Sequence, residues 1–259
     1  MSSRLAAYRR AGRPPTVLLL HGVFMDHTLW DDVLKLRSDI RAVILDMPGH
    51  GTSDPAGLTS LDAAMDAVTA TLTAEDAPPV VIVGHSWGGM VGLRLAVARP
   101  DLVRGLVLSN TPLVRTHGPT RIGFQAQRAL LAAGFPPTAY GRMAARSLIG
   151  PEYLVDHPDV AGRMAARVSA MGRTRIRQTL TSVLLAPRDA VHLVGELQIP
   201  WRAVGGARDY VLAGGVADVI RQKGDLLIAP GGHTSPLEAP HVIADALGAV
   251  LDDIHRPHG

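Results

Sequence analysis

A serine lies between two glycines in a setting that could make it a nucleophile. Residues 84–88 are Gly-His-Ser-Trp-Gly and match the pattern G-x-S-x-G. The β-branched run 80–83 predicts a buried strand before this turn, and the Ala- and Leu-rich run 90–98 predicts a helix after it. This context is typical of a nucleophile elbow with Ser86 at its tip. The Trp87 backbone N–H, at the start of the helix, is placed to donate to an oxyanion.

An acid and a histidine follow downstream, and both could assist this serine. Asp209 comes directly after the apolar run 201–205, and His233 comes after the run 225–229. Loops that follow strands can hold their side chains over the carboxyl ends of a parallel sheet. His233 is therefore predicted to take the proton of Ser86 and pass it to the leaving group. Asp209 is predicted to hold the imidazole in the right tautomer and to stabilise the imidazolium.

The elements that must position these residues alternate along the chain. We predict strands at 16–20, 41–45, 80–83, 104–109, 201–205 and 225–229, and a weak one at 5–9. We predict helices at 29–36 (with Thr28 as a possible cap), 59–72, 90–98, 236–251 and part of 212–222. This alternation predicts an α/β fold with a doubly wound, mostly parallel sheet of seven or eight strands.

A helical block interrupts the alternation. Helices are predicted at 121–133, 138–148, 160–171 and 174–185, with no convincing strand among them. We therefore expect a core of residues 1–111 and 193–259, with a helical cap or lid formed by residues 112–192. This block holds eleven arginines against four acids. A solvated helical face explains most of them, but one or two arginines could reach the pocket and bind a substrate carboxylate or phosphate.

Composition bounds the class of protein. With 259 residues, 47% hydrophobic and only 4% aromatic, the chain can form one large domain with an aliphatic core. No apolar run approaches the ~18 residues of a membrane span, and the first ten residues lack an apolar signal core. A soluble, cytoplasmic protein is expected. The absence of cysteine excludes disulfides, a cysteine nucleophile and thiolate metal sites.

Other polar residues have simpler explanations than catalysis. His21, His50 and His85 are expected to pack or to orient loops, and Asp46 and Asp54 to form turns. The three histidines do not fit a zinc site, because no two lie at the i, i+4 spacing of a helix. We expect no cofactor, no metal, no nucleic acid and no membrane partner, but a small-molecule substrate that could be anionic.

The sequence resembles the α/β-hydrolase superfamily over nearly its whole length. Four matches carry the resemblance: His21-Gly22 after a strand, D-x-x-G-x-G-x-S at 46–53, G-H-S-W-G-G at 84–89, and Gly232-His233 with Glu238-x-Pro240 behind it. The chain order Ser86, Asp209, His233 is the order of the family's triad. The resemblance implies an open sheet, usually of eight strands, with a helical cap after the sixth strand. Residues 112–192 fall at that place.

The resemblance also implies finer features. In the family, the loop after His21-Gly22 supplies a second oxyanion-hole N–H, which falls on Val23 here, with Phe24 as the runner-up. Only about fifteen residues precede the His-Gly strand, so either the family's first strand is expected to be absent or the chain starts late. Asn110 stands where some members carry the acid, and this favours Asp209.

The chain looks like capped members such as enol-lactonases, C–C bond hydrolases and small carboxylesterases. A serine at position 86 argues against dehalogenase or epoxide hydrolase chemistry, which uses an aspartate there. The leading hypothesis is a serine hydrolase that cleaves an ester, thioester or lactone through an acyl-enzyme. One alternative keeps the triad for C–C hydrolysis, acyl transfer, or lyase or cyclase chemistry. Another is a ligand receptor without catalysis.

Overall fold

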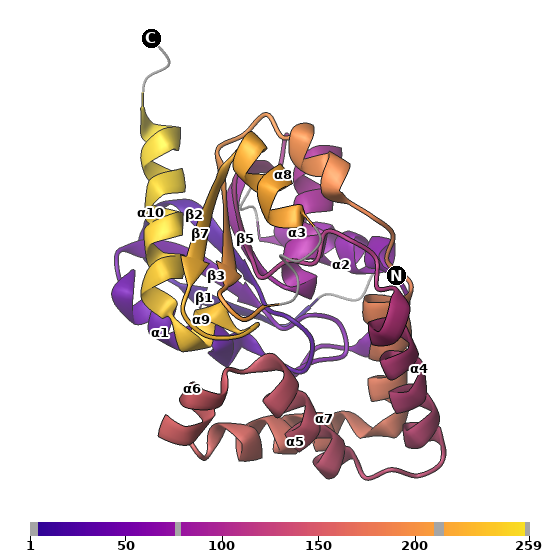
Figure 1. The fold of residues 1–259 in the computed structure, drawn as a ribbon. Coiled ribbons are helices and arrows are strands. Elements are labelled where there is room, and N and C mark those ends of the chain that lie inside the picture. Colours follow the sequence, from indigo (N-terminus) through magenta and orange to yellow (C-terminus); the bar gives the residue numbers. More distant parts are fainter. Residues whose placement is uncertain (1–4, 76–78, 210–214, 257–259) are drawn as a thin grey trace.

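The structure is a computed structural model that describes residues 5–75, 79–209 and 215–256. The strands in these ranges are β1 (Ala7–Arg10), β2 (Arg13–Leu20), β3 (Ile40–Leu45), β4 (Val80–His85), β5 (Val103–Ser109), β6 (Trp201–Gly206) and β7 (Asp225–Ala229). They form one seven-stranded sheet in the order β1-β3-β2-β4-β5-β6-β7 (Figure 1). Only β1 pairs antiparallel, with β3. The predicted α/β class and its mostly parallel sheet are confirmed.

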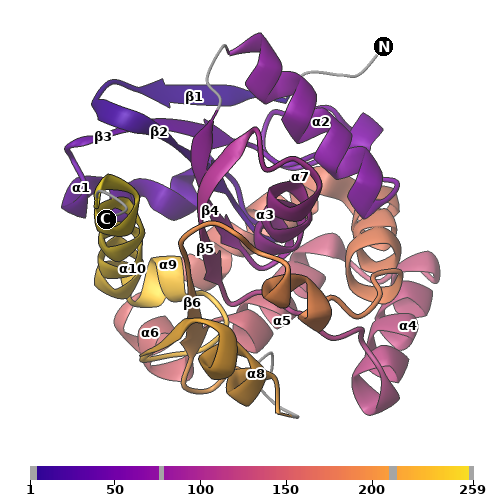
Figure 2. The ribbon, with the colours of Figure 1, turned by 90° about the horizontal axis from the view of Figure 1, so that it is seen from above.

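Helices cover both faces of this sheet. The α-helices of the described ranges are α1 (Asp31–Leu36), α2 (Leu61–Ala74), α3 (Trp87–Ala98), α4 (Gly118–Ala132), α5 (Pro137–Leu148), α6 (Pro151–Asp156), α7 (Val160–Thr179), α8 (Val216–Lys223), α9 (Ser235–Glu238) and α10 (Pro240–His255). Short turns are η1 (His27–Trp30), η2 (Pro55–Gly57), η3 (Leu180–Leu185) and η4 (Val191–Gly195). Helix α3 packs on β4 and β5 from one side, and α10 packs on β5 and β6 from the other (Figure 2).

The centre of the sheet explains why its strands are unbroken apolar runs. Every residue of β4 is buried, and so are the last six residues of β2. A strand that is covered on both faces has no solvent side, so hydrophobic residues need not alternate with polar ones. Among the residues that the structure describes, no helix has both the length and the apolar character to cross a membrane.

The helical block lies where it was predicted, between β5 and β6. It consists of α4, α5, α6, α7 and η3, and in Figure 1 helices α5, α6 and α7 lie together below the sheet. We call residues 112–192 the helical insertion. The break that the sequence predicted inside 160–185 is present, because Gly172 has a φ of 73° and interrupts the helical path of α7. The division into a core and a functional cap stays a prediction.

Three local predictions were wrong. Thr28 does not cap a helix, because Asp26 is the cap of η1 and accepts from the Thr28 N–H at 3.1 Å. The last helix is not continuous: Pro240 lacks an N–H and forces the residue before it out of the helical region, so α9 and α10 are separate. Helix α6 was missed because it is only six residues long. Residues 212–214 of another predicted helix lie outside the described ranges.

Close backbone packing holds α3 against the sheet. A Cβ atom built at Gly88 would lie 2.1 Å from the carbonyl oxygen of Leu20 in β2. Side-chain movement cannot relieve this overlap, because the obstacle is main chain in the middle of the sheet. Position 88 therefore accepts only glycine if the helix is to start directly over the end of β2.

We predict that Gly88→Ala lowers the free energy of unfolding by at least about 1–3 kcal/mol, the usual cost of overpacking. Gly123→Ala is the matched control, since a Cβ there would meet no atom within 4 Å. In the middle of α4 it should stabilise the protein by about 0.5–1 kcal/mol. Urea denaturation of both variants measures the difference, and equal effects would refute this account of Gly88.

Candidate active site

The predicted catalytic residues lie at one edge of the sheet. Parallel pairing places Leu20 of β2 beside Gly84 of β4, so neighbouring strands end at the same level. Ser86 follows β4, Asp209 follows β6 and His233 follows β7. Three loops that are far apart in the chain therefore converge above the carboxyl ends of the strands, where open α/β sheets bind their ligands.

Ser86 has the strained backbone of a tight strand-to-helix turn. Its φ is 50° and its ψ is −111°, in a region that favours glycine and costs another residue about 1–3 kcal/mol. Two hydrogen bonds hold it there. The Ser86 N–H donates to the Ser109 carbonyl at 2.8 Å, and the Ser86 carbonyl accepts from the Met90 N–H at 3.0 Å. The strain thus sits at the residue that was predicted to be the nucleophile.

The side chains of Ser86, His233 and Asp209 form a continuous hydrogen-bonded chain. His233 Nε2 lies 2.8 Å from Ser86 Oγ, and His233 Nδ1 lies 3.0 Å from each carboxylate oxygen of Asp209. The three residues are buried, with exposed fractions of 5%, 4% and 8% in the order Ser86, His233, Asp209. An ionised carboxylate only accepts, so Nδ1 carries the proton and Nε2 accepts from the serine hydroxyl. Such an arrangement can pull a proton from Ser86.

Asn110 is a partner of this chain that the sequence reasoning missed. Its Nδ2 donates to Asp209 Oδ2 at 2.7 Å, while its Oδ1 accepts from the Ser235 N–H at 3.3 Å. It lies directly after β5 and so links this strand to the loops after β6 and β7. From the sequence, Asn110 was interpreted only as a residue that cannot be the catalytic acid. Its position at the alternative acid site was the signal that it could lie next to Asp209, the predicted acid.

Glu238 ties the loop of His233 to the helical insertion. Its Oε2 accepts from the backbone N–H groups of Gly150 and Gly232, both at 2.8 Å, and its Oε1 accepts from Thr234 N–H at 3.0 Å. The His233 N–H itself donates to the Leu148 carbonyl at 2.8 Å. The backbone on both sides of His233 is therefore fixed by one carboxylate and by the end of α5.

The loop of residues 22–26, which we call the predicted oxyanion loop, passes directly beside the serine. A Cβ atom built at Gly22 would lie 3.0 Å from Ser86 Cβ, so the chain that continues through Val23 and Phe24 lies close to the serine. Phe24 has a φ of 64°, a second strained residue at this edge. Trp87 is the first residue of α3, where backbone N–H groups have no partner within the helix. Val23, Phe24 and Trp87 stay predictions as oxyanion-hole donors.

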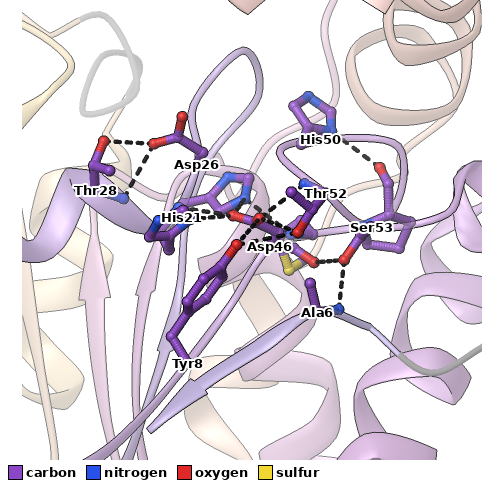
Figure 3. A network of polar contacts seen from close by, with 12 residues as sticks. Ala6, Tyr8, His21, Asp26, Thr28, Asp46, His50, Thr52 and Ser53 are labelled. Atoms are coloured by element: carbon purple, nitrogen blue, oxygen red, sulfur yellow. Dashed lines mark hydrogen bonds and ion pairs between the residues drawn. The ribbon is translucent and has the colours of Figure 1, made fainter. Parts of the chain in front are cut away.

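A buried carboxylate fixes this loop from behind. Asp46 has no exposed surface and accepts from the backbone N–H groups of His27 at 2.8 Å and Thr52 at 2.9 Å (Figure 3). The side chains of Tyr8 and His27 also donate to it. Burial alone would raise the pKa of Asp46, but the hydrogen bonds from His27 and Thr52 outweigh it, and the pKa is lowered. Asp46 therefore shapes the turn that follows it, as predicted, and also joins this turn to the predicted oxyanion loop.

Three buried histidines are neutral and do not take part in the proton chain. Burial lowers the pKa of His21, His50 and His85, for His50 to about 3, and the nearby His233 adds to the effect on His85. His21 shapes its loop as expected, since its Nδ1 donates to the Gly22 carbonyl at 2.7 Å and its Nε2 accepts from Met47 N–H at 2.9 Å.

One arginine of the helical insertion contacts the same loop. Arg167 of α7 forms an ion pair with Asp26 at 2.6 Å and donates to Thr28 Oγ1 at 2.7 Å. Asp26 in turn caps η1, which follows the predicted oxyanion loop. Arg167 is thus an arginine of the insertion that reaches a pocket, but its charge is already paired with Asp26.

Comparisons with known proteins identify the family of this chain. The model of the alpha/beta hydrolase family matches residues 17–246, and the chain belongs to this family. Lipase LipV from Mycobacterium tuberculosis is 31% identical over 248 residues, which cover 92% of this chain and 94% of the lipase. Family membership and this relative support a hydrolytic enzyme.

Solved structures show the same fold at lower identity. The enol-lactonase from Burkholderia xenovorans LB400 superposes with a TM-score of 0.83 at 18% identity, covering 96% of each chain. A thermophilic esterase from Thermogutta terrifontis gives 0.82 at 21% identity, covering 97% of this chain and 94% of the esterase. At such identities the likeness concerns the fold, and the chemistry must be argued from the residues of this chain.

We predict that Glu238→Gln lowers the free energy of unfolding by about 1–3 kcal/mol. The amide replaces one accepting oxygen by a donor, so at least one backbone N–H loses its partner. Glu196→Gln, at an exposed glutamate, is the control and should change stability by less than about 0.5 kcal/mol. Urea denaturation at neutral pH compares them, and an unchanged Glu238→Gln variant would contradict the structural role of this carboxylate.

The buried histidines predict a loss of stability in acid. Below pH ~6.5 the unfolded chain protonates His50 while the folded chain keeps it neutral until about pH 3. The free energy of unfolding then falls by up to ~1.4 kcal/mol per pH unit for this residue. His50→Gln should reduce the fall between pH 7 and pH 4 by about 3 kcal/mol. The exposed His117 provides the control variant His117→Gln, whose denaturation curves should follow wild type.

Proposed function

We propose that this protein is a serine hydrolase that cleaves an ester, thioester or lactone of a small molecule. The observation that carries the proposal is the directed hydrogen-bond chain from Ser86 Oγ through His233 to Asp209. A buried chain of this kind, ending at a serine in a strained turn, has no evident structural purpose. Similarity to a relative named as a lipase supports an ester substrate.

The roles follow from the movement of one proton. As Ser86 Oγ attacks the carbonyl carbon, its proton passes to His233 Nε2, and the carbonyl oxygen becomes an oxyanion. The backbone N–H groups of Trp87 and of Val23 (or Phe24) stabilise this charge. The intermediate collapses to an acyl-enzyme when the leaving group takes the proton from His233.

The second half of the reaction repeats these roles with water. His233 removes a proton from the attacking water, the tetrahedral intermediate forms again, and its collapse returns the proton to Ser86 as the acid departs. Asp209, oriented by Asn110, stabilises the imidazolium in both halves. The same groups would serve C–C hydrolysis, acyl transfer, or lyase or cyclase chemistry on other substrates, and a receptor without catalysis is the second alternative.

The decisive experiment is labelling by a fluorophosphonate, read by intact mass. Wild type should gain one label, and Ser86→Ala should gain none. Ser182→Ala, which removes a buried serine of η3 outside the site, should label like wild type. Short p-nitrophenyl esters should be hydrolysed by wild type, with kcat at least about 10⁴-fold lower in Ser86→Ala.

Each outcome selects one of the functions. Labelling together with ester turnover supports the hydrolase. Labelling without turnover of any ester in the series favours the same triad in a reaction other than ester hydrolysis. No labelling of wild type would overturn the nucleophile assignment and favour a receptor.

A further inference from the structure

A small cavity lies between the predicted oxyanion loop, the turn after Asp46 and helix α7. Its volume is about 240 Å³. The residues that line it are Phe24, Met25, Asp26, Gly49, His50, Gly51, Arg167, Ala170, Met171 and Arg175. A pocket that holds a whole ligand usually measures ~300–1,000 Å³, so this cavity has room for one end of a substrate.

Two of the lining residues, Phe24 and His50, lie next to the surroundings of Ser86. Phe24 belongs to the predicted oxyanion loop, two positions after Gly22, where a built Cβ atom would lie 3.0 Å from Ser86 Cβ. The ring of His50 lies 5.4 Å from the ring of Trp87, the residue that follows the serine. The end of a substrate whose carbonyl is bound at Ser86 would reach this cavity past Phe24 and His50.

The lining carries one net positive charge. Arg167 and Asp26 form an ion pair and neutralise each other. His50 contributes no charge at neutral pH, because burial lowers its pKa to about 3. Its Nδ1 donates to the Pro48 carbonyl, while its Nε2 is buried without a hydrogen-bond partner in the described part of the chain. The ring points away from the Asp46 cluster (Figure 3).

Arg175 supplies the remaining charge. It is half-buried, and within the described ranges its guanidinium makes no hydrogen bond or ion pair. It follows the break of α7 at Gly172, and Met171 lines the cavity on the other side of the same break. A guanidinium that is partly desolvated beside apolar side chains and left without an acid is poised for an anionic ligand.

We propose that this cavity binds a carboxylate of the substrate and that Arg175 holds it through paired N–H donors. The inference rests on the proposed function, which it narrows to esters of carboxylate-bearing molecules. A single positive charge matches a monoanionic carboxylate better than a phosphate dianion. The free Nε2 of His50 can accept from a hydroxyl or amide group beside the carboxylate.

The test compares esters that differ only in charge. Mono-p-nitrophenyl adipate and p-nitrophenyl hexanoate place a carboxylate or a methyl group at the end of the same acyl chain. 4-Acetoxybenzoate and 4-methylphenyl acetate make the same comparison on the alcohol side. Wild type should prefer the anionic ester of at least one pair, and Arg175→Gln should lower kcat/KM for that ester by about 10- to 100-fold while leaving its neutral partner unchanged.

Matched variants separate a local effect from the overall charge. Arg142→Gln removes one exposed arginine of the insertion that does not line this cavity, and should keep the preference. Arg175→Lys keeps the charge but lacks the planar guanidinium, and should keep only part of the preference for the anionic ester. Equal loss in Arg142→Gln and Arg175→Gln, or no preference in wild type on either side, would overturn the proposal while ester turnover keeps the hydrolase assignment.

A binding experiment tests the carboxylate site even if the protein hydrolyses none of these esters. Titration calorimetry of Ser86→Ala with hexanoate, 4-hydroxybenzoate and inorganic phosphate should show tighter binding of a carboxylate than of phosphate. Adding Arg175→Gln should weaken that binding at least 10-fold. If no ester is hydrolysed but this dependence on Arg175 is found, the carboxylate site stands and the proposed function fails. Binding that ignores Arg175, or that favours phosphate, would refute the site.

Discussion

The hydrogen bond between Ser86 Oγ and His233 Nε2 joins residues that are 147 positions apart in the chain, at a distance of 2.8 Å. Neither loop can supply such accuracy alone, since a loop of this kind has many conformations of similar energy. The parallel sheet supplies it by ending β4 and β7 at one edge, and the contact of α3 with β2 sets the height of the serine turn. Ser86 and His233 are thus held in place by the core beneath them.

Main-chain N–H groups help to hold this polar edge together. Asp46 and Glu238 each accept from two or three backbone N–H groups, and Asn110 receives one as well. A carboxylate that is surrounded by N–H donors is worth more than a pair of surface charges, because its partners cannot rotate away. The neutral histidines nearby add shape without adding charge that would compete with His233.

Much of this arrangement could be predicted because it depends on local patterns. The strands were visible as aliphatic runs, and Ser86, Asp209 and His233 each follow one of them. The first residues of helices were harder to predict. Asp and Thr are both common N-cap residues, so the sequence alone does not decide between Asp26 and Thr28. Asn110 and Glu238 owe their roles to residues far away in the chain, Asp209 and Gly150 respectively. Their partners depend on packing between loops, which no spacing in the sequence encodes.

The link between the helical insertion and the loop of His233 uses the carbonyl of Leu148 and the N–H of Gly150, which are main-chain atoms. The carbonyl at position 148 is available from any residue, but position 150 is restricted, because a Cβ atom there would lie 2.5 Å from Glu238 Oε2. The rest of the insertion can therefore drift in sequence while this link survives. A change in the length of α5 would shift both atoms by a full residue and detach the loop. A foreign insertion grafted onto this core would therefore have to match the original in register at this one point, however different its surface.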